Sequence, residues 1–147
     1  MWNAKKSVML SLVCNRLVIA VVVAVGVFTP LLAGGYVDYM DQAPSMARPL
    51  TFTVLGSCAV ALVALFCLDR LLVNIRRNQV FIHENVTLLR RISWCCFGIA
   101  LILLVSYYYM MFLVAGLAAA FMGLILRVVK NVIEEAVILK NDNDLTI

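Results

Sequence analysis

Long apolar stretches alternate with short polar segments along this chain. The longest, residues 92–126, contains no Asp, Glu, Lys or Arg. One helical crossing of a bilayer needs about 20 apolar residues, so this stretch is too long for one crossing and just long enough for two with a tight turn. Two helices also pair their own backbone amides and carbonyls, which hydrocarbon demands because it contains no water. The pattern therefore predicts a helical hairpin within a membrane.

The other apolar stretches predict two further spans, which gives an all-α membrane protein with four transmembrane helices arranged as two helical hairpins. The approximate spans in this single domain of residues 1–147 are 8–33, 50–72, 92–108 and 111–130, with a cytoplasmic connection at 73–91 and a cytoplasmic helical tail at 131–147. Within the connection, apolar residues recur at helical spacing from Glu84 onward. This spacing predicts a helix that lies on the membrane or runs straight into the third span.

Turn-forming and aromatic residues indicate where the helices end. Gly34 and Gly35 are expected to end the first helix, and residues 36–49 would then form an external loop. Residues 107–111 comprise three tyrosines and two methionines. Tyrosine prefers the membrane interface, so this segment predicts the outer turn between the third and fourth spans. Trp2 and Trp94 are expected at the inner interface for the same reason.

The charged start and first apolar stretch resemble both a cleaved signal peptide and a retained span. A signal peptide has an apolar region of about 7–15 residues followed by a cleavage motif of small residues. Here the apolar stretch is longer, and its exit at residues 31–35 places leucine where the motif needs a small residue. We therefore expect the first span to be retained.

Composition and charge support a membrane location. The chain is 65% hydrophobic and 14% charged, and its mean hydropathy is +1.03, which excludes an ordinary soluble domain. If the amino terminus is cytoplasmic, eleven of the twelve basic residues lie on the cytoplasmic side and Arg48 alone lies outside. This asymmetry follows the positive-inside rule and predicts both termini in the cytoplasm. The positive-inside rule accounts for the positions of the basic residues, whereas binding of nucleic acid would need them clustered on one folded face. Direct binding of nucleic acid is therefore not expected.

Few residues suit catalysis or metal binding. His83 is the only histidine, and the five cysteines lie in apolar segments without the paired spacing of a metal site. The sequence contains neither a Gly-rich phosphate loop nor a Ser-His-Asp set. We therefore expect a protein that is not an enzyme and that uses no cofactor and no metal.

Three charged residues, Arg16, Asp69 and Arg127, fall within about one helical turn of the predicted inner interface. A charge at the centre of a span costs about 2.5–3.5 kcal/mol, whereas a long side chain near the interface reaches water. We hypothesise that Asp69 pairs with Arg16 or Arg127 and holds the first, second and fourth spans together. We prefer this role to ion conduction because the sequence places no second carboxylate deeper in the spans.

Small residues share one face of the fourth span, where they would let helix backbones approach closely. They are Gly116, Ala119, Ala120 and Gly123. Arg127 continues this face, so we expect its side chain to point into the bundle. Lys130 and Glu134 follow as an i, i+4 pair of opposite charge, which favours a helix that continues beyond the membrane to about residue 140.

Three segments of the sequence are similar to a known family. Residues 85–97 (NVTLLRRISWCCF), 119–131 (AAFMGLILRVVKN) and 143–147 (NDLTI) occur in this order. They resemble the bacterial membrane family catalogued as domain of unknown function 2975. The resemblance implies a small bacterial protein with four helical spans, often encoded beside a short helix-turn-helix regulator, and it implies no reaction. Family members tend to carry Thr or a similar N-cap where this chain has Ile82, which puts the capping of the connecting helix in question.

We interpret the chain as a multi-pass protein of the bacterial cytoplasmic (plasma) membrane. The first functional hypothesis is an interaction or regulatory protein that docks a cytoplasmic partner, such as the helix-turn-helix regulator, on a basic face built from residues 80–91 and 127–147. The rival is a small transporter or channel, which would have to oligomerise because four spans enclose little space. The expected partners are the lipid bilayer, a cytoplasmic protein and, as a further candidate, another copy of the chain.

Overall fold

In the computed structural model, which describes residues 4–41 and 43–146, the chain forms four long α-helices and one short 3-10 helix. The elements are α1 (Ala4–Tyr39), η1 (Pro44–Met46), α2 (Ala47–Arg76), α3 (His83–Val105) and α4 (Met110–Leu145). The described part of the chain contains no strand. Each of the four α-helices is long and apolar enough to cross a membrane. The predicted all-α class with four candidate spans is therefore confirmed.

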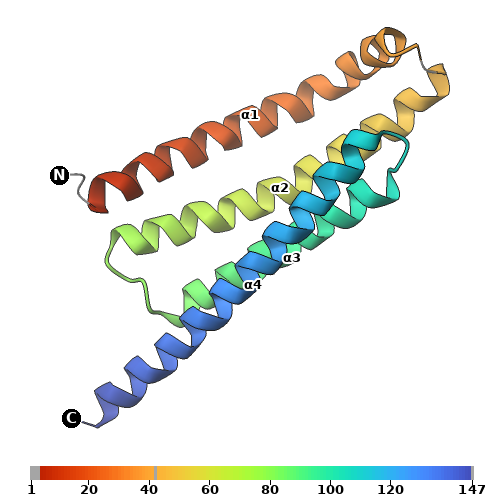
Figure 1. Ribbon diagram of the computed structural model, residues 1–147. Helices are drawn as coiled ribbons and strands as arrows, with labels where there is room; N and C mark the ends of the chain where they lie inside the picture. Colours follow the sequence, from red (N-terminus) through yellow and green to blue (C-terminus); the bar gives the residue numbers. More distant parts are fainter. Residues whose placement is uncertain (1–3, 42, 147) are drawn as a thin grey trace.

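The helices form an open row rather than a closed bundle (Figure 1). α1 packs against α2, α2 against α3, and α3 against α4. The described backbone of α4 does not approach α1 or α2 closely, and α4 reaches them through the Phe112 side chain at the turn-side start of the helix. The first turn of α1, the last turn of α4 and the α2–α3 connection lie at one end of the row, which we call the terminal end (Figure 1). The α1–α2 and α3–α4 connections lie at the other, the turn end (Figure 1).

α1 is longer than the sequence pattern predicts. It continues through Gly34 and Gly35 to Tyr39, so the predicted end of the helix is wrong. Glycine in a helix interior costs about 1 kcal/mol, and a Cβ built at either position would have nothing within 4 Å. Packing beyond the glycines offsets this cost, because Val37 is 1% exposed and lies in a core cluster with Leu50 of α2.

The connections between helices are correspondingly short. Residues 40–43 alone separate α1 from η1, and residue 42 among them lies outside the described part, so the predicted external loop of residues 36–49 is wrong. Asp41 turns the chain there with a φ of 53°. Asn78, with a φ of 62°, follows α2 in the left-handed conformation that commonly terminates helices. Residues 106–109 connect α3 to α4, which overlaps the predicted outer turn.

α3 resolves the two alternatives for the connecting segment. It is one helix from His83 to Val105, so the connection runs straight into the third span. Ile82 precedes the helix in extended conformation, and its side chain makes no capping hydrogen bond, as the departure from the family pattern suggested. α3 ends before the predicted span 92–108 does. Trp2, expected at the inner interface, lies outside the described residues.

A buried apolar cluster holds α2 and α3 together near the terminal end. Leu71 of α2 packs with Leu88, Leu89 and Ile92 of α3, and Ile133 of α4 packs against the cluster. α4 then continues to Leu145, past its predicted end near residue 140. Its carboxyl-terminal part projects beyond the α2–α3 connection (Figure 1).

Candidate functional site

The structure brings together two of the three charged residues singled out in the spans. Arg16 of α1 donates from Nε to Asp69 Oδ1 of α2 at 3.2 Å. The Arg16 side chain is 65% exposed and that of Asp69 is 24% exposed. One position before Arg16, the buried Asn15 donates from Nδ2 to the carbonyl oxygen of Leu65 at 3.2 Å. The α1–α2 interface is thus held by an exposed ion pair beside a buried hydrogen bond.

Arg127 is not part of this pair. Its guanidinium carbon lies 5.7 Å from the centroid of the Trp94 ring of α3, a cation–π arrangement. Its side chain is exposed rather than directed into a bundle, so that expectation is wrong. The predicted junction of three helices does not form, because α3 separates α4 from α2 in the row.

The small residues of α4 do form a close helix contact. A Cβ built at Gly116 would lie 3.1 Å from Leu104 Cγ, and one built at Gly123 would lie 3.2 Å from Phe97 Cε1. The missing side chain at Gly123 also exposes its carbonyl oxygen, which accepts a hydrogen bond of 2.8 Å from the buried Ser93 hydroxyl. The other two members of the stripe, Ala119 and Ala120, are half-buried. These glycines therefore bind α4 to α3.

A buried amide network joins α2 to α3, and the sequence interpretation missed it. Asn85 is 1% exposed; its Nδ2 donates to the carbonyl oxygens of Gln79 and Val80 at 2.7 and 2.8 Å. Its Oδ1 accepts a hydrogen bond of 2.9 Å from Asn74 Nδ2. One signal was present in the sequence. Asn85 lies four residues before Leu89 and seven before Ile92, so it shares the apolar face of α3 with them.

The turn end of the same interface carries a second buried hydrogen bond. The hydroxyls of Thr53 in α2 and Ser106 after α3 lie 2.7 Å apart, and both residues are less than 9% exposed. The Thr53 hydroxyl also lies 2.9 Å from the Pro49 carbonyl oxygen, and the Ser106 hydroxyl lies 2.9 Å from the Ile102 carbonyl oxygen. Because each hydroxyl has one proton, one of them donates to the other and the second donates to its carbonyl oxygen. α2 and α3 are therefore hydrogen-bonded at both ends, which makes them the central pair of the row.

Charges at and beyond the inner ends of the spans gather at the terminal end. Glu134 of α4 lies 2.6 Å from Lys130 Nζ, which is the predicted i, i+4 pair, and 3.6 Å from Arg90 Nη2 of α3. These cations, Lys130 first, hold the pKa of the Glu134 carboxyl below its usual value. Glu84 accepts a hydrogen bond of 2.9 Å from Arg70 Nε.

Nothing in the described residues forms a metal centre. No three His, Cys, Asp or Glu side chains converge there, and the described cysteines are all free. His83, the only histidine, is exposed at the start of α3.

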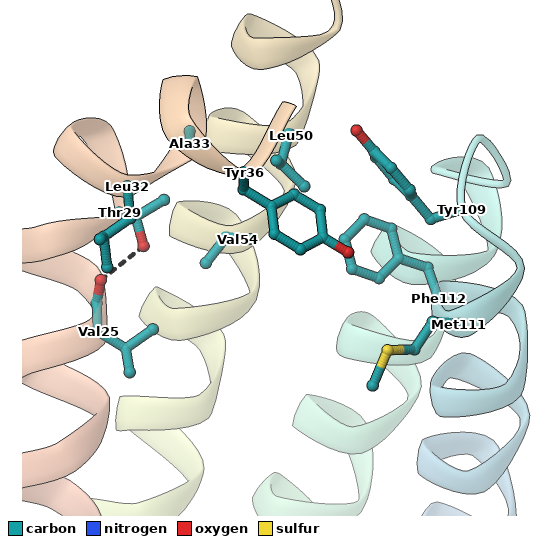
Figure 2. Close-up of a pocket in the computed structure, with 10 residues that line it drawn as sticks. All are labelled: Val25, Thr29, Leu32, Ala33, Tyr36, Leu50, Val54, Tyr109, Met111 and Phe112. Carbon is teal, nitrogen blue, oxygen red and sulfur yellow. Dashed lines mark hydrogen bonds between the residues drawn. The ribbon is translucent and has the colours of Figure 1, made fainter. Parts of the chain in front are cut away.

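An apolar cavity of about 290 Å³ opens near the turn end, between α1, α2 and the start of α4 (Figure 2). The Tyr36 and Tyr109 rings lie at its edge with centroids 6.1 Å apart, and Tyr109 packs edge-on against Phe112 at 5.4 Å. The Tyr109 hydroxyl is buried without a hydrogen-bond partner among the described residues. The cavity marks where the open row of helices separates, and its lining suits an apolar occupant.

Comparisons with known proteins agree with the resemblance seen in the sequence. A protein-family model described as "protein of unknown function (DUF2975)" matches residues 33–147, from the last turns of α1 through α4. The match includes all three segments on which the resemblance depends, so the resemblance is confirmed. The searches of curated proteins and of solved structures gave no match.

Proposed function

Because the chain belongs to the DUF2975 family of proteins of unknown function, we propose its role from its own surface: it is a non-enzymatic membrane protein that docks a cytoplasmic protein on the end of α4. In this proposal it is a multi-pass protein of the bacterial cytoplasmic membrane, inserted as two helical hairpins with both termini inside. The distribution of basic residues supports this orientation, since Arg48 alone belongs to the turn end.

The length of α4 supports a part outside the bilayer. Its 36 residues extend about 54 Å at 1.5 Å per residue, whereas the hydrocarbon core is about 30 Å thick. The stretch from Met110 to the first charge at Arg127 is about 26 Å long, close to one bilayer thickness. The excess length therefore lies at the carboxyl end, and we call residues 131–145 the α4 extension.

The exposed apolar face of the α4 extension is the observation that carries the proposal. Val137 is 3% exposed and faces the rest of the protein, whereas Val132 and Leu139 are 61% and 64% exposed. These two side chains are seven residues apart and share one face of the helix. Apolar side chains at this spacing in water are typical anchors for a helix that docks in a groove.

The chemistry of this surface indicates the kind of partner. The exposed apolar anchors suit a protein with an apolar groove. The charges around them have both signs, because Arg90 and Lys140 of the predicted basic face are accompanied by four carboxylates of the α4 extension: Glu134, Glu135, Asp142 and Asp144. The rim of the groove is therefore expected to carry charges of both signs. The family resemblance suggests the helix-turn-helix regulator encoded beside many members. Nucleic acid would reach the complex through that regulator rather than through this chain.

A site-specific crosslinking experiment tests the proposal. The full chain carries a photoreactive residue at Leu139 in lipid nanodiscs and is illuminated with the purified regulator from the neighbouring gene. We expect a crosslinked complex that Val132→Asp abolishes. The matched control places the photoreactive residue at Leu117, which is also exposed on α4 but lies within the predicted span.

Equal crosslinking from Leu117 and Leu139, or none from either, would contradict docking on the α4 extension. A crosslink between two copies of the chain would show that the α4 extension binds a second copy of the chain and not the regulator, which would also contradict the proposal. The rival transporter hypothesis predicts solute flux in reconstituted vesicles that disappears with Asp69→Ala. Docking predicts no such flux and an intact crosslink in that variant.

A further inference from the structure

A small hollow on the α3–α4 surface gathers three cations around a tryptophan. The hollow measures about 50 Å³ and is lined by Arg90, Ser93 and Trp94 of α3 and by Arg127 and Lys130 of α4. Ser93 and Trp94 follow Arg90 by three and four positions, and Lys130 follows Arg127 by three, so each set lies on one side of its helix. Because the Ser93 hydroxyl is already bonded to the Gly123 carbonyl, the cations are the groups free to recognise a ligand.

The cations around this hollow outnumber the carboxylates. Glu134 is the carboxylate that pairs with the lining in the described structure, through Lys130 at 2.6 Å and Arg90 at 3.6 Å. Arg127 lies over the Trp94 ring and has no carboxylate oxygen within 4 Å among the described residues. Two positive charges therefore remain uncompensated, which makes the hollow attractive to an anion.

The position of the hollow along the helices places it at a membrane surface. Arg127 is the first charge after the uncharged stretch 92–126, and Trp94 lies at the opposite end of that stretch. Trp94 is 62% exposed, and tryptophan prefers the level of the lipid headgroups. Toward the turn end, Leu101 of α3 and Leu124 of α4 are exposed at 65% and 55%. An apolar surface thus leads from the hollow into the bilayer.

We propose that this hollow binds the headgroup phosphate of an anionic phospholipid from the inner leaflet. Arg127 and Arg90 donate to the phosphate oxygens, Lys130 adds charge while it stays paired with Glu134, and Trp94 forms the wall at headgroup level. The acyl chains then follow the exposed apolar surface of α3 and α4. The headgroup level of the hollow and its apolar flank favour a lipid over free phosphate, because free phosphate needs neither.

The test uses Trp94 as its own reporter. The chain has two tryptophans, so a Trp2→Phe background leaves Trp94 as the single tryptophan, which is excited selectively over the tyrosines at long wavelength. The full chain is placed in nanodiscs that mix phosphatidylglycerol with phosphatidylcholine, and one of the two lipids carries brominated acyl chains that quench tryptophan. We expect stronger quenching by brominated phosphatidylglycerol than by brominated phosphatidylcholine at the same mole fraction. Equal quenching by the two lipids would overturn the proposal whatever the variants do.

Two variants identify the hollow as the source of the preference. Arg127→Gln should lower the relative affinity for phosphatidylglycerol about fivefold, since each basic residue near the surface contributes about 1 kcal/mol. Arg76→Gln is the matched control, because Arg76 is an exposed cation at the end of α2 that does not line the hollow. An equal loss in both variants would assign the preference to general surface charge and overturn the proposal. Loss of the preference on adding inorganic phosphate would identify a soluble anion as the ligand instead.

Discussion

Asn74 and Asn85 share a buried hydrogen bond of 2.9 Å that joins the last turn of α2 to the first turn of α3. Asn85 also donates to the Gln79 and Val80 carbonyl oxygens in the connection between the two helices. The Asn85 side chain therefore pairs with three polar groups: one side-chain amide and two carbonyl oxygens of the connection. A short connection between helices would otherwise leave such carbonyl oxygens without a partner in the protein. Because α2 and α3 are the central helices, this contact fixes how the two halves of the chain meet.

Removal of the Asn85 amide should destabilise the protein more than any surface change. Asn85→Ala leaves the buried Asn74 amide without its partner and removes two partly buried bonds to carbonyl oxygens. A buried unsatisfied group costs about 1–3 kcal/mol. We expect the free energy of unfolding, measured by denaturant titration in mixed micelles, to fall by at least that amount. Asn131→Ala is the control, since Asn131 is exposed on α4, and its effect should stay within about 0.5 kcal/mol. Equal effects of the two substitutions would refute the role of the network.

A side chain at Gly123 should separate α4 from α3. The Cβ of Gly123→Val would lie 3.2 Å from Phe97 Cε1 and 3.3 Å from Cys96 Cβ, and overpacking of this kind costs about 1–3 kcal/mol. Gly35→Val is the control, because a Cβ there has no atom within 4 Å. We expect a lower melting temperature in detergent for the first variant and little change for the second. Equal melting temperatures for both variants and the native protein would show that stability does not depend on the close contact at Gly123.

The ion pair between Arg16 and Asp69 should contribute little to stability. Asp69 should be energetically coupled to Arg16 and not to Arg127. An exposed pair is worth about 0.2–1 kcal/mol, and here the Arg16 side chain is 65% exposed. In a double-mutant cycle we expect Asp69→Asn and Arg16→Gln to be non-additive, whereas Asp69→Asn and Arg127→Gln should be additive. Unfolding free energies of the single and double variants supply both comparisons. Coupling to Arg127 would restore the junction of three helices that the structure lacks.

The sequence predicted those features that depend on one helix at a time. The length of the uncharged stretch 92–126 was by itself enough to predict two helices. The face that carries Gly116 and Gly123 and the pair of Lys130 with Glu134 both follow from helical periodicity. Each of these needs only the register of residues within a single helix.

The sequence could not predict features that depend on which helices are neighbours. The partner of Asp69 was open because Arg16 and Arg127 lie at the same level, and only the order of helices in the row separates them. The continuation of α1 through Gly34 and Gly35 depends on the contact of Val37 with α2, which local turn propensity does not contain. The Asn74–Asn85 bond likewise joins two helices that the pattern treats separately.

Membrane topology is the claim on which the proposed docking depends, and cysteine labelling measures it directly. In a variant whose five native cysteines are replaced by alanine, Asp38→Cys marks the turn end and Asp144→Cys marks the α4 extension; both positions are exposed. Intact cells are treated with a membrane-impermeant maleimide before and after permeabilisation. We expect Asp38→Cys to react in intact cells and Asp144→Cys to react only after permeabilisation. Labelling of Asp144→Cys in sealed cells would place the α4 extension outside and contradict the account.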